Sequence, residues 1–160
     1  MPSQRPAYSA LQIGLHWLTA LLVIAAWLTS DGMHRVLEQK LEGSYQGTPL
    51  HVALGLSVLT VVGIRLVVRL REGAPGPQED LPVAHAQARH WGHVALYALM
   101  IGVPLGGFAA WFAGLDVARL VHGFAGNTLL ALAGGHAVIA LYHHYVRKDG
   151  TLLRMMRPGE

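Results

Sequence analysis

The segment LVHGFAGNTLLALAGGHAVIALYHHYVRK, residues 120–148, reads as a membrane-spanning helix that carries four histidines. About 20 apolar residues in a helix cross the roughly 30 Å hydrocarbon core of a bilayer. Histidine is costly at that depth and normally faces a bundle interior, a water path or a bound ion. His122 and His136 lie 14 residues apart, and His143 and His144 follow near the end of the segment. The two internal histidines therefore require partners from elsewhere in the chain.

The composition of the 160-residue chain is that of a membrane protein. Hydrophobic residues make up 52% and charged residues 13%, whereas soluble domains carry about 25% charged residues. Cysteine is absent, which excludes disulfides, thiolate-bound zinc or iron–sulfur sites and the attachment motif of c-type haem. Ten histidines stand against twelve lysines and arginines. Histidine is therefore the one strong haem-iron ligand type present in quantity.

Three further segments are long and apolar enough to cross a bilayer. The four spans are expected at about 8–30, 50–70, 90–113 and 120–146. The first is too long for the apolar part of a signal peptide, and no small-residue cleavage site follows it. Polar or Pro/Gly-rich loops join the spans, and no second domain or internal repeat is visible. We therefore expect one all-α domain, residues 1–160, folded as an integral membrane four-helix up-down bundle.

Lysine and arginine sort to one side of these spans. With the N-terminus inside, nine basic residues fall on the cytoplasmic side and three on the outer side. The nine are Arg5, Arg65, Arg69, Arg71, Arg89, Arg147, Lys148, Arg154 and Arg157, and the three are Arg35, Lys40 and Arg119. The positive-inside rule then predicts that both termini are cytoplasmic. Because orientation accounts for the basic residues, no nucleic-acid partner is expected.

Four histidines pair by depth in such a bundle. His51 and His122 begin the second and fourth spans on the outer side. His16 and His136 lie roughly 12–16 Å from the inner ends of their spans at helical rise. His122 and His136 share one helix face, because 14 residues differ by about 40° around the helix and about 21 Å along it. The pairs His51/His122 and His16/His136 are the layout for two bis-histidine b-type haems in a bundle core.

Several residues beside these pairs have two interpretations each. Glycines near the pairs either leave room for a flat macrocycle or permit close helix packing; they are Gly55, Gly126, Gly134 and Gly135. Arg65, 14 residues after His51, either pairs with propionates of the inner haem or extends to the membrane edge. The other histidines are expected to bind no haem, namely His34, His85, His90, His93, His143 and His144.

Four motifs carry a family resemblance: YSALQIGLHWL, LHVALGLSVL followed by VVGIRLVVRL, HWGHVALYAL, and HHYVRKDGTLLRMM. With them the chain resembles the prokaryotic cytochrome b561 family of inner-membrane dihaem proteins, and within it the members that oxidise superoxide. The resemblance covers essentially the whole chain. Its last motif is specific, because membrane insertion alone does not require KDGTLLRMM after a span. The resemblance implies two haem b groups, held by His16 with His136 and by His51 with His122.

The resemblance also implies an activity, the oxidation of periplasmic superoxide to dioxygen with ubiquinone as electron acceptor. Arg119, three residues before His122, fits a basic outer position of the family, where it would attract an anion or bond a quinone carbonyl. The alternative is that Arg119 caps the membrane edge. Arg35 and Lys40, in the loop after the first span, are expected to help Arg119 attract an anion. The acids of the same loop oppose this attraction; they are Asp31, Glu38 and Glu42. The loop GLDVARLVHG is shorter than expected for this activity, which bears on the identity of the substrate.

Two other functions stay open on the sequence. A haem b electron-transfer subunit would link the quinone pool to a partner redox protein without superoxide activity. A histidine-lined metal or proton transporter would bind no haem, which the paired depths and the family motifs oppose. Haem content separates the transporter from the other two functions, and reactivity with superoxide separates the oxidase from the electron-transfer subunit.

Overall fold

The computed structural model describes residues 7–76 and 83–158, and over these ranges it is all-helical. Its α-helices are α1 (Ala10–Leu28), α2 (Met33–Leu41), α3 (Leu50–Glu72), α4 (Val83–Ala113) and α5 (Asp116–Tyr142), followed by a π-helical turn (His143–Arg147) and a 3₁₀ turn (Leu153–Met155). All the α-helices except α2 are long and apolar enough to cross a membrane. The all-α class is thereby confirmed over the described residues, and four helices suit the predicted spans in length and composition. Arg5 lies outside the described residues.

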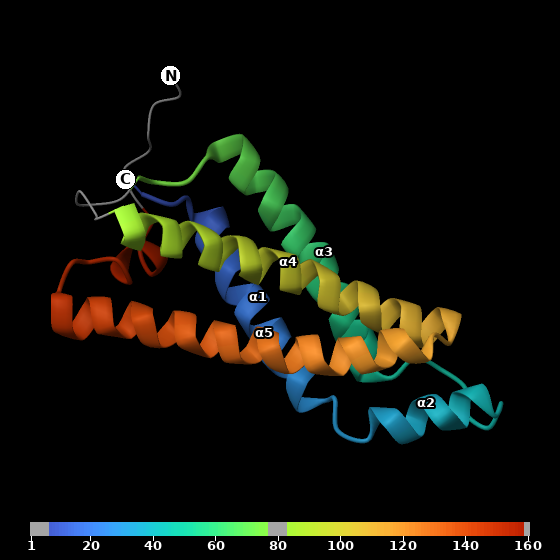
Figure 1. Ribbon diagram of the computed structural model, residues 1–160. Helices are drawn as coiled ribbons and strands as arrows, with labels where there is room; N and C mark the ends of the chain where they lie inside the picture. Colours follow the sequence, from blue (N-terminus) through green and yellow to red (C-terminus); the bar gives the residue numbers. More distant parts are fainter. Residues whose placement is uncertain (1–6, 77–82, 159–160) are drawn as a thin grey trace.

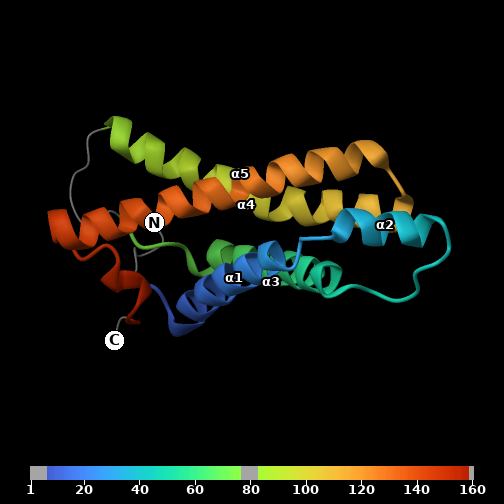
Figure 2. The ribbon, with the colours of Figure 1, turned by 90° about the horizontal axis from the view of Figure 1, so that it is seen from below.

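The four long helices form two pairs that lie side by side (Figures 1 and 2). Helix α1 packs along α3 and α4 packs along α5, while contacts between α3 and α4 join the two pairs. Helices α1 and α5 hardly touch, so the bundle is open on that side. Helix α1 begins at the end of the bundle where α5 finishes, and α2 lies at the opposite end (Figure 1). A cavity lined by residues of all five α-helices lies between the pairs.

The packed core is small, and large apolar side chains point outward. The buried cluster consists of Val58, Val62, Met100 and Leu129. Leu21 is 64% exposed and Phe124 is 78% exposed. Lipid tails are as apolar as leucine, so such side chains cost nothing when they face a bilayer. The surface therefore fits the membrane assignment.

Helix α2 corrects the prediction that the segment between the first two spans is a polar loop. Met33, Leu37 and Leu41 recur at four-residue spacing, which places them on one face of a helix. Leu37 is 8% exposed, and the helix packs its apolar face over the end of the bundle. Burial of Leu37, rather than of the whole face, anchors this short, charged helix, since Leu41 is 60% exposed.

Two span boundaries also differ from the prediction. Helix α4 begins at Val83 rather than near residue 90, because the segment VAHAQARHW is rich in residues that favour helix. Helix α5 begins at Asp116 rather than near residue 120. Gly114 adopts a φ of +65°, a conformation that glycine tolerates best, and this lets a two-residue turn join α4 to α5.

The segment after α5 folds back onto the end of the bundle where α1 begins. Trp17 Nε1 donates to the Met155 carbonyl at 2.8 Å, and Arg154 Nη1 donates to the Gly76 carbonyl at 2.9 Å. Asp149 accepts hydrogen bonds from His143 and from the backbone N–H of Thr151. Burial raises the pKa of Asp149, but these hydrogen bonds outweigh it and lower the pKa to about 2. The KDGTLLRMM motif is thus a folded cap rather than a tail.

Candidate haem sites

A cavity of about 390 Å³ lies between the two helix pairs at the end of the bundle that α2 covers. All five α-helices contribute to its wall, and most of the lining is apolar. Its polar side chains are Ser30, His34, His51, Arg119, His122 and Asn127. Cofactor sites commonly have volumes of about 300–1,000 Å³ and a few converging polar groups in an apolar wall. The cavity has this character.

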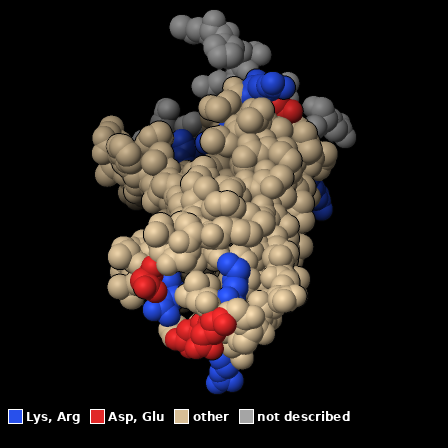
Figure 3. All heavy atoms as spheres, turned by 90° about the vertical axis from the view of Figure 1, so that its right-hand side faces the viewer, with Lys and Arg blue, Asp and Glu red and all other residues tan. Residues whose placement is uncertain are grey.

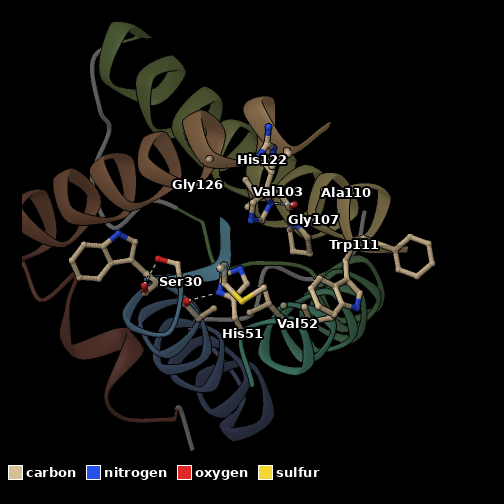
Figure 4. Close-up of a pocket in the computed structure, with 18 of the residues that line it drawn as sticks. Ser30, His51, Val52, Val103, Gly107, Ala110, Trp111, His122 and Gly126 are labelled. Carbon is tan, nitrogen blue, oxygen red and sulfur yellow. Dashed lines mark hydrogen bonds between the residues drawn. The ribbon is translucent and has the colours of Figure 1, made fainter. Parts of the chain in front are cut away.

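His51 and His122 face each other across this cavity from α3 and α5, as Figure 4 shows. Their ring centres are 5.8 Å apart. His51 Nδ1 donates to the Ala26 carbonyl at 2.8 Å, and His122 Nδ1 donates to the Val103 carbonyl at 2.8 Å. A carbonyl can only accept, so the ring proton sits on Nδ1 and the Nε2 lone pair is left for a metal. Both imidazoles are therefore prepared as ligands.

The spacing of this outer pair fits one metal ion between the rings. Imidazole nitrogens bind metals at about 2 Å, so two rings on opposite sides of one iron have centres roughly 6 Å apart. The separation of 5.8 Å is close to that value. The predicted outer pair is thus brought together with suitable spacing and suitable hydrogen bonds for a haem iron.

Glycines leave room for the imidazole rings of the outer pair, His51 and His122. A Cβ on Gly107 would lie 2.9 Å from His122 Cε1, closer than real contacts allow. Gly55 and Gly126 line the cavity, and a Cβ on Gly55 would meet nothing within 4 Å. Gly107 was not identified from the sequence, since its need depends on which face of α4 meets His122. The only sequence signal was its place in the glycine pair of PLGGFAA.

The inner pair is also brought together, but with a different hydrogen-bond pattern. The ring centres of His16 and His136 are 6.5 Å apart. Arg65 Nη2 donates to His16 Nδ1 at 2.8 Å, so His16 holds its proton on Nε2. For His16 to bind iron through Nε2, Arg65 must turn to another acceptor. A haem propionate is such an acceptor, so the residues fit a haem when Arg65 changes partner.

His93 forms part of the inner layer, although no role there was expected for it from the sequence. Its ring centre lies 5.3 Å from that of His136, and its Nδ1 donates to the Arg89 carbonyl at 2.7 Å. The motif RHWGH places His93 on the face of α4 that meets α5. A small cavity of about 20 Å³ near Arg65 is lined by Tyr8, Gln12, Arg65, Arg69, Tyr97 and Met155.

Arg119 lies on the wall of the outer cavity. Its Nη1 donates to His34 Nε2 of α2, and its Nη2 is 3.7 Å from the Asp116 carboxylate. Lys40, also from α2, donates to the Trp111 carbonyl and lies 4.7 Å from the centre of the Trp111 ring. Acidic and basic side chains are interspersed on this face of the molecule (Figure 3). Arg119 is therefore a local cation at the cavity, without a broad positive field around it.

Comparison with known proteins gives consistent matches along the whole chain. The model of the prokaryotic cytochrome b561 family matches residues 7–158. A cytochrome b562 of Cereibacter sphaeroides is 40% identical, covering 98% of this chain and 99% of its own. A probable superoxide oxidase CybB of Yersinia pestis is 34% identical, covering 93% of this chain and 95% of its own. A cytochrome b561 homolog 2 of Escherichia coli is 27% identical, covering 93% of this chain and 90% of its own.

The lengths of these alignments differ. The alignment with the Yersinia protein extends over 172 positions, whereas 93% of this chain is about 149 residues, so about 23 positions fall opposite gaps in this chain. The alignment with the Cereibacter protein extends over 159 positions for 98% of the chain and leaves almost no such gaps. This chain therefore lacks segments that the probable superoxide oxidase contains.

Proposed function

The chain belongs to the prokaryotic cytochrome b561 family, and on that premise we propose that it is a dihaem superoxide:ubiquinone oxidoreductase of the bacterial inner membrane. Members of this family are membrane electron-transfer proteins that bind haem b. The finer proposal is that His51 and His122 hold an outer haem, that His16 and His136 hold an inner haem, and that both termini are cytoplasmic. Two superoxide anions would each lose one electron to become dioxygen, and two electrons with two protons would convert ubiquinone to ubiquinol.

The observation that carries the proposal is the outer histidine pair. Haem b, when bound, supplies reversible one-electron redox chemistry. The Ala26 and Val103 carbonyls hold the two imidazoles with Nδ1 protonated, which leaves the Nε2 lone pair of each available. Two histidine ligands leave an iron no open position, so this chain favours electron transfer over the binding of dioxygen at the metal. Most of the cavity wall is apolar, and α2 covers the end of the bundle at this cavity.

Arg65 is the proposed anchor for the propionates of the inner haem. It lies in the second half of α3, and its guanidinium stacks over the Tyr97 ring at 5.4 Å. Its hydrogen bond is to the neutral imidazole of His16 rather than to a carboxylate. A charged guanidinium in a span is costly without an anionic partner. A propionate would supply that partner and would free His16 Nδ1 to donate.

Arg119 is the proposed point of contact for the electron donor. It lies on the wall of the same cavity as the outer histidines, so an anion bound to it would be close to the outer haem edge. Electron transfer needs proximity but no bond between donor and iron. The role of this arginine in the reaction is therefore to hold a small anion where an electron can leave it.

A stopped-flow measurement tests this function. Purified oxidised protein is mixed with superoxide, and the haem α-band is followed with and without ubiquinone. The proposal predicts rapid haem reduction without quinone and a lower steady-state level of reduced haem with it, because quinone removes the electrons. A normal b-haem spectrum that does not respond to superoxide would contradict the oxidase function.

The second candidate is a haem b electron-transfer subunit that links the quinone pool to a partner redox protein. The specific observation in its favour is the near-gapless alignment with a protein named only as a cytochrome. The alignments with the probable superoxide oxidase and with cytochrome b561 homolog 2 both leave about 23 positions opposite gaps in this chain. In this case haem reduction by ubiquinol would be rapid, and superoxide would have no effect.

A further inference from the structure

Helix α2 contributes a histidine to the outer cavity that directly contacts Arg119. His34 Nε2 accepts a hydrogen bond from Arg119 Nη1, although the two residues are 85 positions apart in the chain. His34 Nδ1 lies 3.2 Å from Glu38 Oε1, one turn further along α2. Both His34 and Arg119 line the cavity. A continuous series of side chains, Glu38–His34–Arg119, therefore extends from α2 to the cavity wall.

The protonation of this series follows from its chemistry. A guanidinium has only donors, so His34 Nε2 must carry a lone pair and the ring proton must sit on Nδ1. The protonated Nδ1 lies 3.2 Å from the Glu38 carboxylate. A carboxylate behind a histidine holds the ring in one tautomer and orientation, as it does for the histidines that bind metals. Here the oriented group is not a metal ligand but the acceptor for Arg119.

Helix α2 is itself held in place, so His34 does not depend on a mobile segment. Leu37 is buried beneath it, and Lys40 is bonded to the carbonyl of the buried Trp111. His34 lies three residues before Leu37 and therefore on nearly the same helix face. Its position relative to the end of α4 is thus set by packing and by one charge-assisted hydrogen bond.

The charges near Arg119 make the position of its guanidinium more important for binding an anion than the strength of the surrounding electrostatic field. Arg119 is 3.7 Å from the carboxylate of Asp116, and Glu38 lies on the other side of His34. These acids offset the positive charge, so long-range attraction of an anion is weak. His34 and Glu38 are 65% and 53% exposed at their side chains, and contacts this exposed contribute little to stability. His34 therefore adds little to long-range attraction or to stability, and its remaining effect is to orient the Arg119 side chain.

We propose that His34 is a positioning residue that holds the Arg119 guanidinium at the cavity wall, leaving its other N–H groups to bind a small anionic electron donor. The proposal rests on the proposed function only in that the natural donor is superoxide. The site itself would accept other small anions of similar size. Glu38 supports this role of His34 by favouring the tautomer with the proton on Nδ1, which leaves Nε2 to accept from Arg119.

The test compares anionic and neutral reductants on the haem-loaded protein. Stopped-flow spectroscopy follows reduction of the b-haems by dithionite, which delivers the small radical anion of sulfur dioxide, and by uncharged duroquinol. The variants are His34→Leu, which removes the acceptor, His34→Gln, which keeps an acceptor oxygen, and Arg119→Gln. The matched control is His85→Leu, an exposed histidine in the first turn of α4. Haem content per chain is measured for each protein.

We expect His34→Leu to slow reduction by the anion about three- to tenfold, the range of a local charged contact that guides association. Duroquinol should be unaffected, His34→Gln should restore most of the rate, and Arg119→Gln should be at least as slow as His34→Leu. Combining His34→Leu with Arg119→Gln should add nothing, because both changes remove one interaction. His85→Leu should match the wild type.

The proposal is overturned if His34→Leu keeps the wild-type rate with the anion, if duroquinol is slowed equally, or if the double variant shows additive losses. These results are distinct from failure of the proposed function. A protein that ignores superoxide but shows the His34-dependent preference for the sulfur dioxide anion retains the site and loses the oxidase assignment. A protein that oxidises superoxide equally well with leucine at position 34 keeps the assignment and loses the inference.

Discussion

At the scale of residues, the proposed outer haem site depends on hydrogen bonds that hold the proton of two imidazoles on Nδ1 and leave Nε2 as the possible ligand atom. The carbonyls of Ala26 and Val103 belong to helices other than those that carry His51 and His122. Each ligand is therefore oriented by a neighbouring helix, so four helices define this pair.

Gly107→Ala should disturb the outer haem selectively. Its Cβ would lie 2.9 Å from His122 Cε1, so the ring must turn and its bond to Val103 must weaken. Losing an outer hydrogen bond of this kind typically lowers metal affinity about 10- to 100-fold. Titration of the haem-free protein with haemin, followed by absorbance, should show one weakened site and one unchanged site.

Gly63→Ala is the matched control for this substitution. Gly63 lies in α3, and a Cβ there would meet nothing within 4 Å. It should bind haem as the wild type does. Equal haem affinity in the Gly107 and Gly63 variants would show that the His122 ring tolerates the contact.

The sequence was sufficient to predict which central histidines come together in pairs and insufficient to predict their neighbours. Depth in a membrane helix follows from counting residues at a fixed rise, so the pairing of His51 with His122 follows from their positions in the spans alone. Contacts of His34, His93 and Gly107 depend on how neighbouring helices are rotated against each other. The sequence pattern does not give that rotation when lipid-facing and core-facing residues are equally apolar.

At the scale of elements, α2 and the C-terminal cap close the two ends of the bundle. The α2 segment was expected to be a loop, because nine residues with five charged or polar side chains carry a weak apolar signal. The family motif predicted that KDGTLLRMM was special but not how it folds. The structural reason for the motif lies in the bonds from Trp17 to Met155 and from His143 to Asp149.

Asp149→Asn should destabilise the protein in a pH-dependent way. The folded-state pKa of Asp149 is about 2, below the ordinary value of about 3.9. The ionised group therefore stabilises the fold above about pH 4, and this contribution is lost as pH falls through about 2. Near pH 6, Asp149→Asn should lower the melting temperature by about 2–4 °C, the effect of one hydrogen bond in a chain of this size.

The measurement is a thermal melt of both proteins in detergent at several pH values between 6 and 2. The difference in melting temperature between wild type and Asp149→Asn should shrink as the pH approaches 2. His143→Leu should remove most of the same difference, since it removes the same bond. A difference that stays constant down to pH 2 would contradict the account of this cap.

At the scale of the whole molecule, the fixed thickness of a bilayer allowed the number and length of the long helices to be predicted from the sequence. Span number and approximate length follow from membrane thickness, and the structure has four long helices as expected. The pairing of α4 with α5 follows from the two-residue turn between them, whereas α1 pairs with α3 across a longer connection that contains α2. The open side between α1 and α5 could not be predicted, because neither helix shows a sequence signal for leaving a gap.

Both termini are predicted to be cytoplasmic, and the absence of cysteine makes this simple to measure. Gln46→Cys lies in the connection between α2 and α3, and Met156→Cys lies after the last 3₁₀ turn. A membrane-impermeant maleimide should label Gln46→Cys in spheroplasts and should label Met156→Cys only after detergent is added. The opposite pattern would reverse the orientation and place Arg119 in the cytoplasm.

The central claim is that two histidine pairs at different depths hold two haems, and haem content per chain tests it most directly. The pyridine haemochrome assay on purified protein should give two haem b per chain for the wild type and for the control His144→Leu. His122→Leu and His136→Leu should each give one, with different residual spectra, and the double variant should give none. One haem per chain in the wild type, or two in either single variant, would contradict the claim.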